Sequence, residues 1–313
     1  MMTKKLLTYS IKIIPLLIGV LAFSQQDAQY THYMYNMSVI NPGYATDDPD
    51  VINLGLLHRA QWVGSVGGPT TSSFFAHTTL GNRMEGGISA IHDQIGDVVK
   101  ETNLFADFAY AIPISQNTKL SFGIKAGATF FSTNFNGFVY SDDLPDPAFA
   151  NNLSKTSPNI GIGAFYFGKQ FYIGLSAPNL LESEHLDNDS GIVTSRKEET
   201  HLFFTAGYVY DINESLKIKP AIMAKSVSGA PISLDLTTNV LINDTFEFGV
   251  GYRFDDSLSG LFNIKVIDSL RIGYAYDYTL SNLGRFNSGS HEIILLFDIG
   301  KLGNGFDKSP RFF

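Results

Sequence analysis

Hydrophobic and polar residues alternate with a period of two along most of the chain after residue 50. Between Lys119 and Phe130, Leu, Phe, Ile and Ala at even positions alternate with Lys, Ser, Gly and Thr at odd positions. The same alternation returns over residues 216–225 and 270–279. Because successive side chains of a β-strand point to opposite faces, this pattern predicts strands with one apolar and one polar face.

About fourteen segments of this kind follow one another, and none of the chain after residue 45 has the pattern of a long amphipathic helix. They begin near Val51, Pro69, Gly86, Val99, Lys119, Asn159, Gln170, His201, Leu216, Ile232, Thr245, Leu258, Leu270 and Ser290. An even number of antiparallel strands is typical of outer-membrane barrels, although alternation alone also fits a soluble β-sandwich. The pattern therefore predicts an all-β fold and leaves its surroundings open.

The lengths of the connections favour a membrane barrel over a soluble β fold. From the fourth connection on, the even-numbered ones are short, whereas residues 141–157 and 179–200 form long odd-numbered ones rich in turn formers or charge. The short eleventh connection near Asp255 is an exception. Outer-membrane barrels have short periplasmic turns and longer extracellular loops, whereas a sandwich has no reason to show this parity. We therefore expect a transmembrane β-barrel of about 14 antiparallel strands.

The amino-terminal residues predict export from the cytoplasm. Three lysines precede an apolar run over residues 13–23, and Ala22-Phe23-Ser24 fits the cleavage site of a signal peptide. The run is too short for a membrane-spanning helix, which needs about 20 residues. The chain has no cysteine, so it carries no disulfide and no lipidated cysteine. The expected parts are a signal peptide (1–24), an N-terminal segment (25–50), the barrel (51–300) and a C-terminal tail (301–313), with the barrel in the outer membrane.

Composition and motifs exclude several functions. Removal of residues 1–24 lowers Lys+Arg from 22 to 19 against 30 Asp+Glu, which moves the net charge from −8 to −11 and disfavours nucleic acid as a partner. Nucleotide-binding and hydrolase motifs are absent, and the seven histidines are scattered. His77 and His92 could meet on neighbouring strands, but isolated strand histidines are usually structural. We expect neither catalysis nor a cofactor or metal; an outer-membrane enzyme is the most distant alternative.

Charged residues of the later strands share one parity, which places them in the lumen if the apolar face meets lipid. These residues are Lys219, Lys225, Asp235, Glu247, Arg253, Lys265, Arg271 and Asp277. A Lys or Arg on the lipid face costs about 2–4 kcal/mol at the membrane midplane, so this confinement is physically meaningful. Their signs alternate between neighbouring strands, which predicts a lumen closed by ion pairs; the alternative, a water-filled selective pore, would favour one sign.

The segment from Gln25 to Ala45 matches neither a helix face nor a strand face. It is rich in aromatic and amide side chains and has almost no charge. We expect it to pack into or across the periplasmic end of the barrel, with its Asn-Pro-Gly turn leading into the first strand near Val51. The candidate residues for a lumen plug or a partner contact are Tyr30, Tyr33, Tyr35, Asn41, Pro42 and Tyr44. The alternative is an untethered tail, which would normally be richer in charge.

The same segment carries a family resemblance. Gln25-Gln26-Asp27, Gln29-Tyr30-Thr31, Tyr33-Met34-Tyr35-Asn36 and Ile40-Asn41-Pro42-Gly43-Tyr44-Ala45 resemble the mature start of the PorP/SprF family of Bacteroidota outer-membrane proteins. Similar blocks follow in order up to "SGSHEIILLF" near the end of the chain. One departure is Gly43, where the family more usually has Ala; because Gly adopts any turn geometry open to Ala, we expect no functional consequence.

The resemblance implies a non-enzymatic role in the type IX secretion system and, in gliding relatives, in delivering or retaining large surface adhesins. The implied partners are a secreted adhesin with a C-terminal sorting domain, periplasmic and outer-membrane components of the secretion system, and the lipid bilayer. A passive porin or small-molecule transporter is the alternative, which the barrel architecture alone would favour.

Overall fold

A computed structural model describes residues 28–46, 51–135, 152–181, 184–189, 192–197 and 200–300. The predicted signal peptide and C-terminal tail lie outside these residues. The strands form a closed, fully antiparallel barrel of 14 strands, which confirms the predicted fold. The first strand, β1 (Val51–Ala60), pairs with the last, β17 (Ser290–Gly300). β10 (His201–Tyr208) and β11 (Tyr210–Asn213) flank Val209 and both pair with the next strand, so they form one barrel strand.

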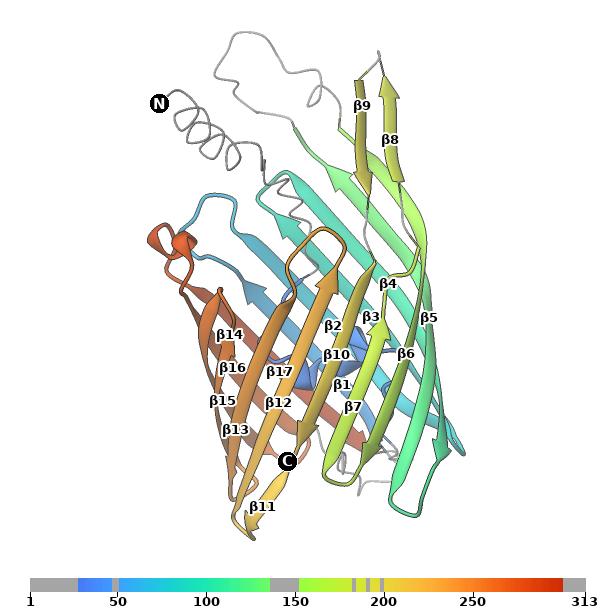
Figure 1. Cartoon of the computed structure of the whole chain (residues 1–313), viewed down its shortest axis with the longest axis vertical. Coiled ribbons are helices and arrows are strands. Elements are labelled where there is room, and N and C mark those ends of the chain that lie inside the picture. Colours follow the sequence, from blue (N-terminus) through green and yellow to red (C-terminus); the bar gives the residue numbers. More distant parts are fainter. Residues whose placement is uncertain are drawn as a thin grey trace, which may run out of the picture.

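The other barrel strands follow in chain order around the wall (Figure 1). They are β2 (Pro69–Gly81), β3 (Met84–Ile95), β4 (Val99–Pro113), β5 (Thr118–Thr133), β6 (Ser154–Gly168), β7 (Phe171–Ala177), β12 (Leu216–Val227), β13 (Ser233–Ile242), β14 (Phe246–Arg253), β15 (Ser257–Ile267) and β16 (Leu270–Thr279). Their starts lie close to the positions that the alternation predicted.

The two ends of the barrel differ in the length of their connections. At one end, which we call the turn end, β2, β4, β6, β11, β13 and β15 each lead into the next strand through a short turn. Asn243 and Asp244 both have positive φ, at 52° and 48°, as a tight hairpin requires and as Asn and Asp tolerate. The other end, which we call the loop end, carries the longer connections and the separate hairpin of β8 (Glu184–Asp189) and β9 (Ile192–Lys197) (Figure 1).

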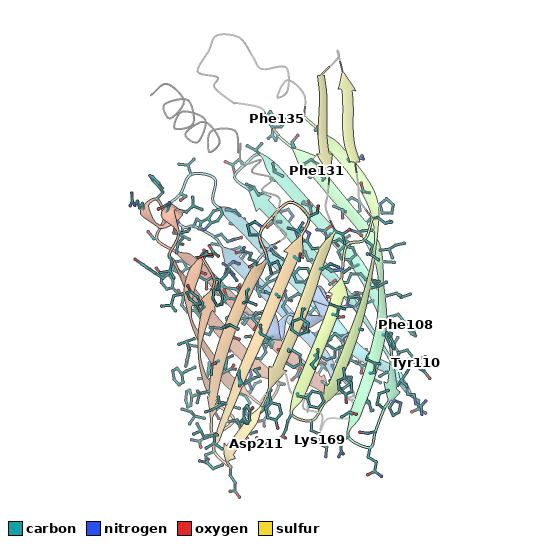
Figure 2. The ribbon with its side chains drawn as sticks, viewed as in Figure 1. Phe108, Tyr110, Phe131, Phe135, Lys169 and Asp211 are labelled. Carbon is teal, nitrogen blue, oxygen red and sulfur yellow. The ribbon has the colours of Figure 1, made fainter. Side chains whose placement is uncertain are left out.

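The outer wall of the barrel is apolar. On β5, the outward-facing Phe122 and Ile124 are half exposed, whereas the inward-facing Ser121 and Lys125 are buried. Figure 2 shows Phe108 and Tyr110 pointing away from the wall. An apolar exterior of this kind fits contact with lipid. Among the described residues, no helix has the length and hydropathy to cross a membrane.

The inward face is not polar throughout. Inward-facing apolar residues pack against the N-terminal segment, namely Leu57, Phe75, Phe203, Met223, Ile294 and Leu296. The core of this protein therefore lies inside the barrel, between the wall and residues 28–46. These apolar side chains depart from the alternation expected of a water-filled barrel because their neighbour in the lumen is protein.

Candidate functional site: the lumen plug and the loop-end cavity

Residues 28–46 lie inside the barrel, and we call them the plug (Figure 1, blue). Every residue from Tyr30 to Thr46 is buried. The plug forms only a short 3₁₀ turn, η2 (Tyr33–Tyr35), and one helical turn, α2 (Met37–Ile40). Elements this short leave most of their backbone groups without internal partners, so the plug depends on hydrogen bonds from the barrel wall.

The first anchor of the plug is a buried cluster, at the loop ends of β1, β16 and β17, that we call the seam cluster. Glu292 accepts hydrogen bonds from the backbone N–H of Thr31 at 2.9 Å and from the backbone and ring nitrogens of His32, both at 2.7 Å. Arg59 pairs with Asp277 at 2.7 Å and with Glu292 at 3.3 Å. It also donates to the Thr31 hydroxyl at 2.9 Å. Each carboxylate thus meets several donors, which a buried charge requires.

The second anchor lies near the turn end, around the ring of Tyr35. The Tyr35 hydroxyl donates a short hydrogen bond to Glu247, which also pairs with Arg271 at 3.2 Å. The ammonium group of Lys219 lies 4.5 Å from the centroid of the Tyr35 ring. Burial raises the pKa of the Tyr35 hydroxyl well above its usual range, and the negative charge of Glu247 raises it further. The phenol therefore stays protonated and acts as a donor to the carboxylate.

The third anchor is the turn at Asn41-Pro42-Gly43, which rests directly on the backbone of β5 and β6. Gly123 and Gly163 face each other across these strands. A β-carbon on Gly123 would lie 1.9 Å from the carbonyl oxygen of Pro42, and one on Gly163 would lie 2.0 Å from the side-chain oxygen of Asn41. Only glycine permits this approach. A β-carbon on Gly43 would also meet the Gly163 backbone, at 2.8 Å, so Gly43 has a packing role that the sequence did not reveal.

Polar groups of β3, β5, β6 and β7 hold the second half of the plug. Lys125 on β5 donates to the carbonyl oxygen of Val39 at 2.6 Å, and Ser176 on β7 donates to that of Ile40 at 2.9 Å. The side chain of Asn41 donates to a carbonyl oxygen of β6 at 3.1 Å. The backbone N–H of Thr46 donates to Glu85, near the turn end of β3, at 2.6 Å. The plug is thus attached on opposite sides of the lumen.

The candidate plug residues lie together in the lumen, but the segment reaches further than expected. Tyr30, Tyr33, Tyr35 and Tyr44 are at most 5% exposed. The prediction placed the segment at the end that carries the short turns. In the structure, Gln29 contacts Arg253 at the loop end of β14, at 3.0 Å, while Tyr35 and Thr46 bond to Glu247 and Glu85 near the turn end. The plug therefore occupies much of the length of the lumen.

The predicted lumen charges fall into two groups. Those buried in the lumen are Lys219, Lys225, Asp235, Glu247, Arg253, Arg271 and Asp277. Arg253 pairs with Asp235 at 2.6 Å across neighbouring strands. Lys265 differs: it is about one-third exposed at the turn end and lies 3.5 Å from Asp268, outside the buried clusters. Lys265 lies two residues before the end of β15, beside a register irregularity, and therefore at the rim.

Several residues that hold the plug were not singled out from the sequence. Arg59 and Glu292 share their parity with apolar residues, Leu57 and Ile294, so alternation gave no reason to assign them to a polar lumen. The alternation placed Lys125 only on the polar face of its strand. Besides Asp107, its partners are backbone carbonyl oxygens of the plug, which leave no mark in the sequence. The sequence signal for Arg59 and Glu292 was that each is a charged residue at a position of the strand whose neighbours on the same face are apolar.

A cavity lies above the plug at the loop end. The plug contributes Ala28, Gln29, Tyr30, Val39 and Ile40 to its lining. The wall contributes apolar side chains, among them Phe105, Phe203 and Met223, and charged ones, among them Asp93, Glu101, Lys225 and Arg253. Within the described part of the chain, no group of three or more His, Asp or Glu residues is placed to hold a metal ion.

A closed antiparallel barrel with an apolar wall and a folded segment in its lumen defines a β-barrel protein of the outer membrane. The model of the PorP/SprF family, described as a type IX secretion system membrane protein, matches residues 22–297. The chain therefore belongs to this family, and it is an outer-membrane component of type IX secretion. No curated protein matches the chain.

Solved structures with a similar fold are outer-membrane barrels of low sequence identity. The CymD monoaromatic hydrocarbon channel is 12% identical, with a TM-score of 0.51 over 86% of this chain and 92% of that chain. The Pseudomonas putida toluene transporter TodX is 10% identical, with a TM-score of 0.49 over 84% and 92%. A Pseudomonas aeruginosa FadL homologue is 9% identical, with a TM-score of 0.45 over 82% and 91%. At these identities the likeness concerns the fold alone.

Proposed function

We propose that this barrel is a non-enzymatic accessory of type IX secretion that binds secreted surface adhesins through their C-terminal sorting domain and helps to deliver or retain them. The observation that carries the proposal is the plug, which is hydrogen-bonded to strands on opposite sides of the lumen beneath a cavity at the loop end. A lumen filled in this way suits binding at one end better than passage from end to end. Family membership supplies the context of secretion.

The alternative function, a passive porin or small-molecule transporter, requires the plug to leave or to rearrange. That movement would expose the buried charges of Glu292, Arg59 and Asp277 and break their hydrogen bonds with the plug. We therefore expect the purified protein to show no sustained conductance in a planar lipid bilayer. A steady open channel formed by the wild-type protein would favour the porin and contradict our proposal.

The direct test is the surface proteome of a strain in which the gene is deleted. We expect secreted proteins that carry a C-terminal sorting domain to disappear from the cell surface and to return when the wild-type gene is restored. Unchanged surface levels of all such proteins in the deletion strain would refute the proposed function.

A plug variant then tests whether the lumen segment takes part. Replacing Tyr30, Tyr33 and Tyr35 with Ser removes three buried rings, each worth about 1.5–3 kcal/mol, and should loosen the plug while the barrel still assembles. We expect normal barrel levels in the outer membrane with reduced adhesin display. The matched control places the same three Tyr→Ser changes on the outer wall, at Tyr210, Tyr252 and Tyr278. Normal adhesin display together with unchanged protease resistance of the plug would show that the segment is an inert tail.

A further inference from the structure

The loop-end cavity has an apolar base. The ring of Tyr30 and the side chain of Ile40 contribute to it from the plug, while Phe203 and Met223 contribute from β10 and β12. These side chains belong to one buried apolar cluster. The base is therefore a continuous apolar surface, of the kind that binds an apolar side chain of a ligand.

Charged residues stand above this base on two sides of the lumen. Asp93 and Glu101 lie near the loop ends of β3 and β4, where they accept hydrogen bonds from Thr71 at 2.5 Å and from Asn103 at 2.9 Å. On the other side, Lys225 and Arg253 lie on β12 and β14.

Arg253 is fixed in place by its neighbours. It bonds Asp235 at 2.6 and 3.2 Å and Gln29 of the plug at 3.0 Å. The cavity thus has Asp93 and Glu101 on one wall, Lys225 and the Arg253–Asp235 pair on the other, and an apolar base between them. The arrangement is held by hydrogen bonds within the protein, so it does not depend on a ligand.

We propose that this cavity binds an extended peptide segment of the secreted partner. An apolar side chain of the peptide rests on the base formed by Tyr30, Phe203 and Met223, and the peptide groups face the charged side chains above it. The inference rests on the proposed function and specifies where and how the partner is held. A pure hydrocarbon fits less well, because it offers no donor or acceptor to the charged side chains of Asp93, Glu101 and Lys225 that line the cavity. A small ion fits less well, because it would leave the apolar base wet. A peptide supplies an apolar side chain together with donors and acceptors.

The plug makes this cavity a site for binding from one side. Ala28 and Gln29 line the cavity, and the chain continues from them down the lumen to Thr46 at the turn end. A peptide that enters from the loop end therefore meets the plug before it can meet the turn end. Part of the plug therefore also forms part of the binding site.

The test uses the full-length barrel purified in detergent and, as probe, the recombinant C-terminal sorting domain of the secreted protein that disappears from the surface of the deletion strain. Met223→Trp fills the base of the cavity. Ile222→Trp, the next residue of β12, places the same ring on the lipid face and is the matched control. Assembly of each variant is checked by heat-dependent migration in gels, so that a misfolded barrel is not mistaken for a binding defect.

We expect Met223→Trp to weaken binding of the probe by about tenfold or more and Ile222→Trp to change it by less than about twofold. A photo-crosslinking benzoylphenylalanine in place of Leu181, at the mouth of the cavity, should form an adduct with the probe, whereas one in place of Ile124 on the outer wall should not. Equal affinity of an assembled Met223→Trp barrel, or no adduct at Leu181, would overturn the inference and leave the proposed function standing. Failure of the wild-type barrel to bind the probe would instead refute the proposed function.

Discussion

Glu292→Leu should release the plug from the barrel wall. The carboxylate of Glu292 is fully buried and accepts three hydrogen bonds from Thr31 and His32 as well as the contact from Arg59. Leucine leaves the donors of the plug without acceptors, whereas Arg59 keeps Asp277 as its partner. A buried donor left without an acceptor costs about 1–3 kcal/mol, and both backbone N–H groups and the ring of His32 lose theirs, so we expect the free energy of plug opening to fall by about 3–5 kcal/mol. The population of the opened plug should then rise roughly 100- to 4,000-fold.

A cysteine placed in the plug measures this opening. Met34 is completely buried and the native chain has no cysteine, so Met34→Cys gives a single reporter. When opening and closing are fast relative to labelling, the rate at which a maleimide modifies this cysteine is proportional to the opened population. The experiment compares Met34→Cys with and without Glu292→Leu in purified barrels that retain heat-dependent migration.

The matched control is Ile293→Ala, which alters the next residue of β17 on the lipid-facing side. It removes apolar surface without touching the seam cluster, so we expect the labelling rate of Met34→Cys to stay within about threefold of the reference. An unchanged labelling rate in an assembled Glu292→Leu barrel would refute the reasoning, because it would show that the plug is held without this carboxylate.

Three further predictions concern the orientation, the wall and the plug turn. A cysteine at Val66, fully exposed at the loop end, should react with an impermeant maleimide on intact cells, whereas one at Asn213, at the turn end, should react only after permeabilisation. Ile222→Arg should destabilise the barrel folded in lipid vesicles by about 2–4 kcal/mol if the residue lies near the midplane, and so lower its folding yield. Met223→Arg should cost less because it faces the lumen. Gly123→Ala should force the plug turn off the wall and raise the labelling rate of Met34→Cys by an amount equivalent to about 1–3 kcal/mol.

Each of these predictions has an internal control and an outcome that contradicts it. Labelling of the turn-end cysteine alone on intact cells would reverse the orientation. The inward arginine would lie opposite Asp235 on β13, so equal folding yields for the two arginine variants would contradict the assigned facing. Gly260→Ala is the control for the glycine variant, because a β-carbon there has no atom within 4 Å. If both alanine variants label at the same rate, the close approach of the turn does not hold the plug.

Alternation and connection lengths were sufficient to predict the barrel because each depends on local sequence. β5 keeps apolar residues on one face and polar or small residues on the other from Lys119 to Phe130, and a turn such as Asn243-Asp244 carries its own conformational preference. The tyrosine-rich composition of the plug likewise predicts its burial. These features can be recognised from short stretches of sequence, because they depend only on residues that are close together in the chain.

The path of the plug could not be predicted in the same way, because its partners are distant in the chain. Thr31 bonds to Asp277 and Glu292, which lie 246 and 261 positions away. The expectation that polar residues face the lumen also failed beside the plug, since the apolar residues Leu57 and Ile294 face inward and pack on it. A rule that expects polar residues inside a barrel assumes water there. In this barrel the rule holds only in part, because the lumen contains a second layer of protein.

The position of the seam cluster ties closure of the barrel to placement of the plug. Arg59 lies on β1 and Glu292 on β17, and they face each other in the register that joins the first strand to the last. Thr31 of the plug bonds to both residues. Neither charge has its full set of partners until the two strands pair with the plug already inside, and an incompletely paired buried charge is costly. A closed barrel with an empty lumen would therefore leave Arg59 and Glu292 short of partners, so the pairing of β1 with β17 and the placement of the plug stabilise each other.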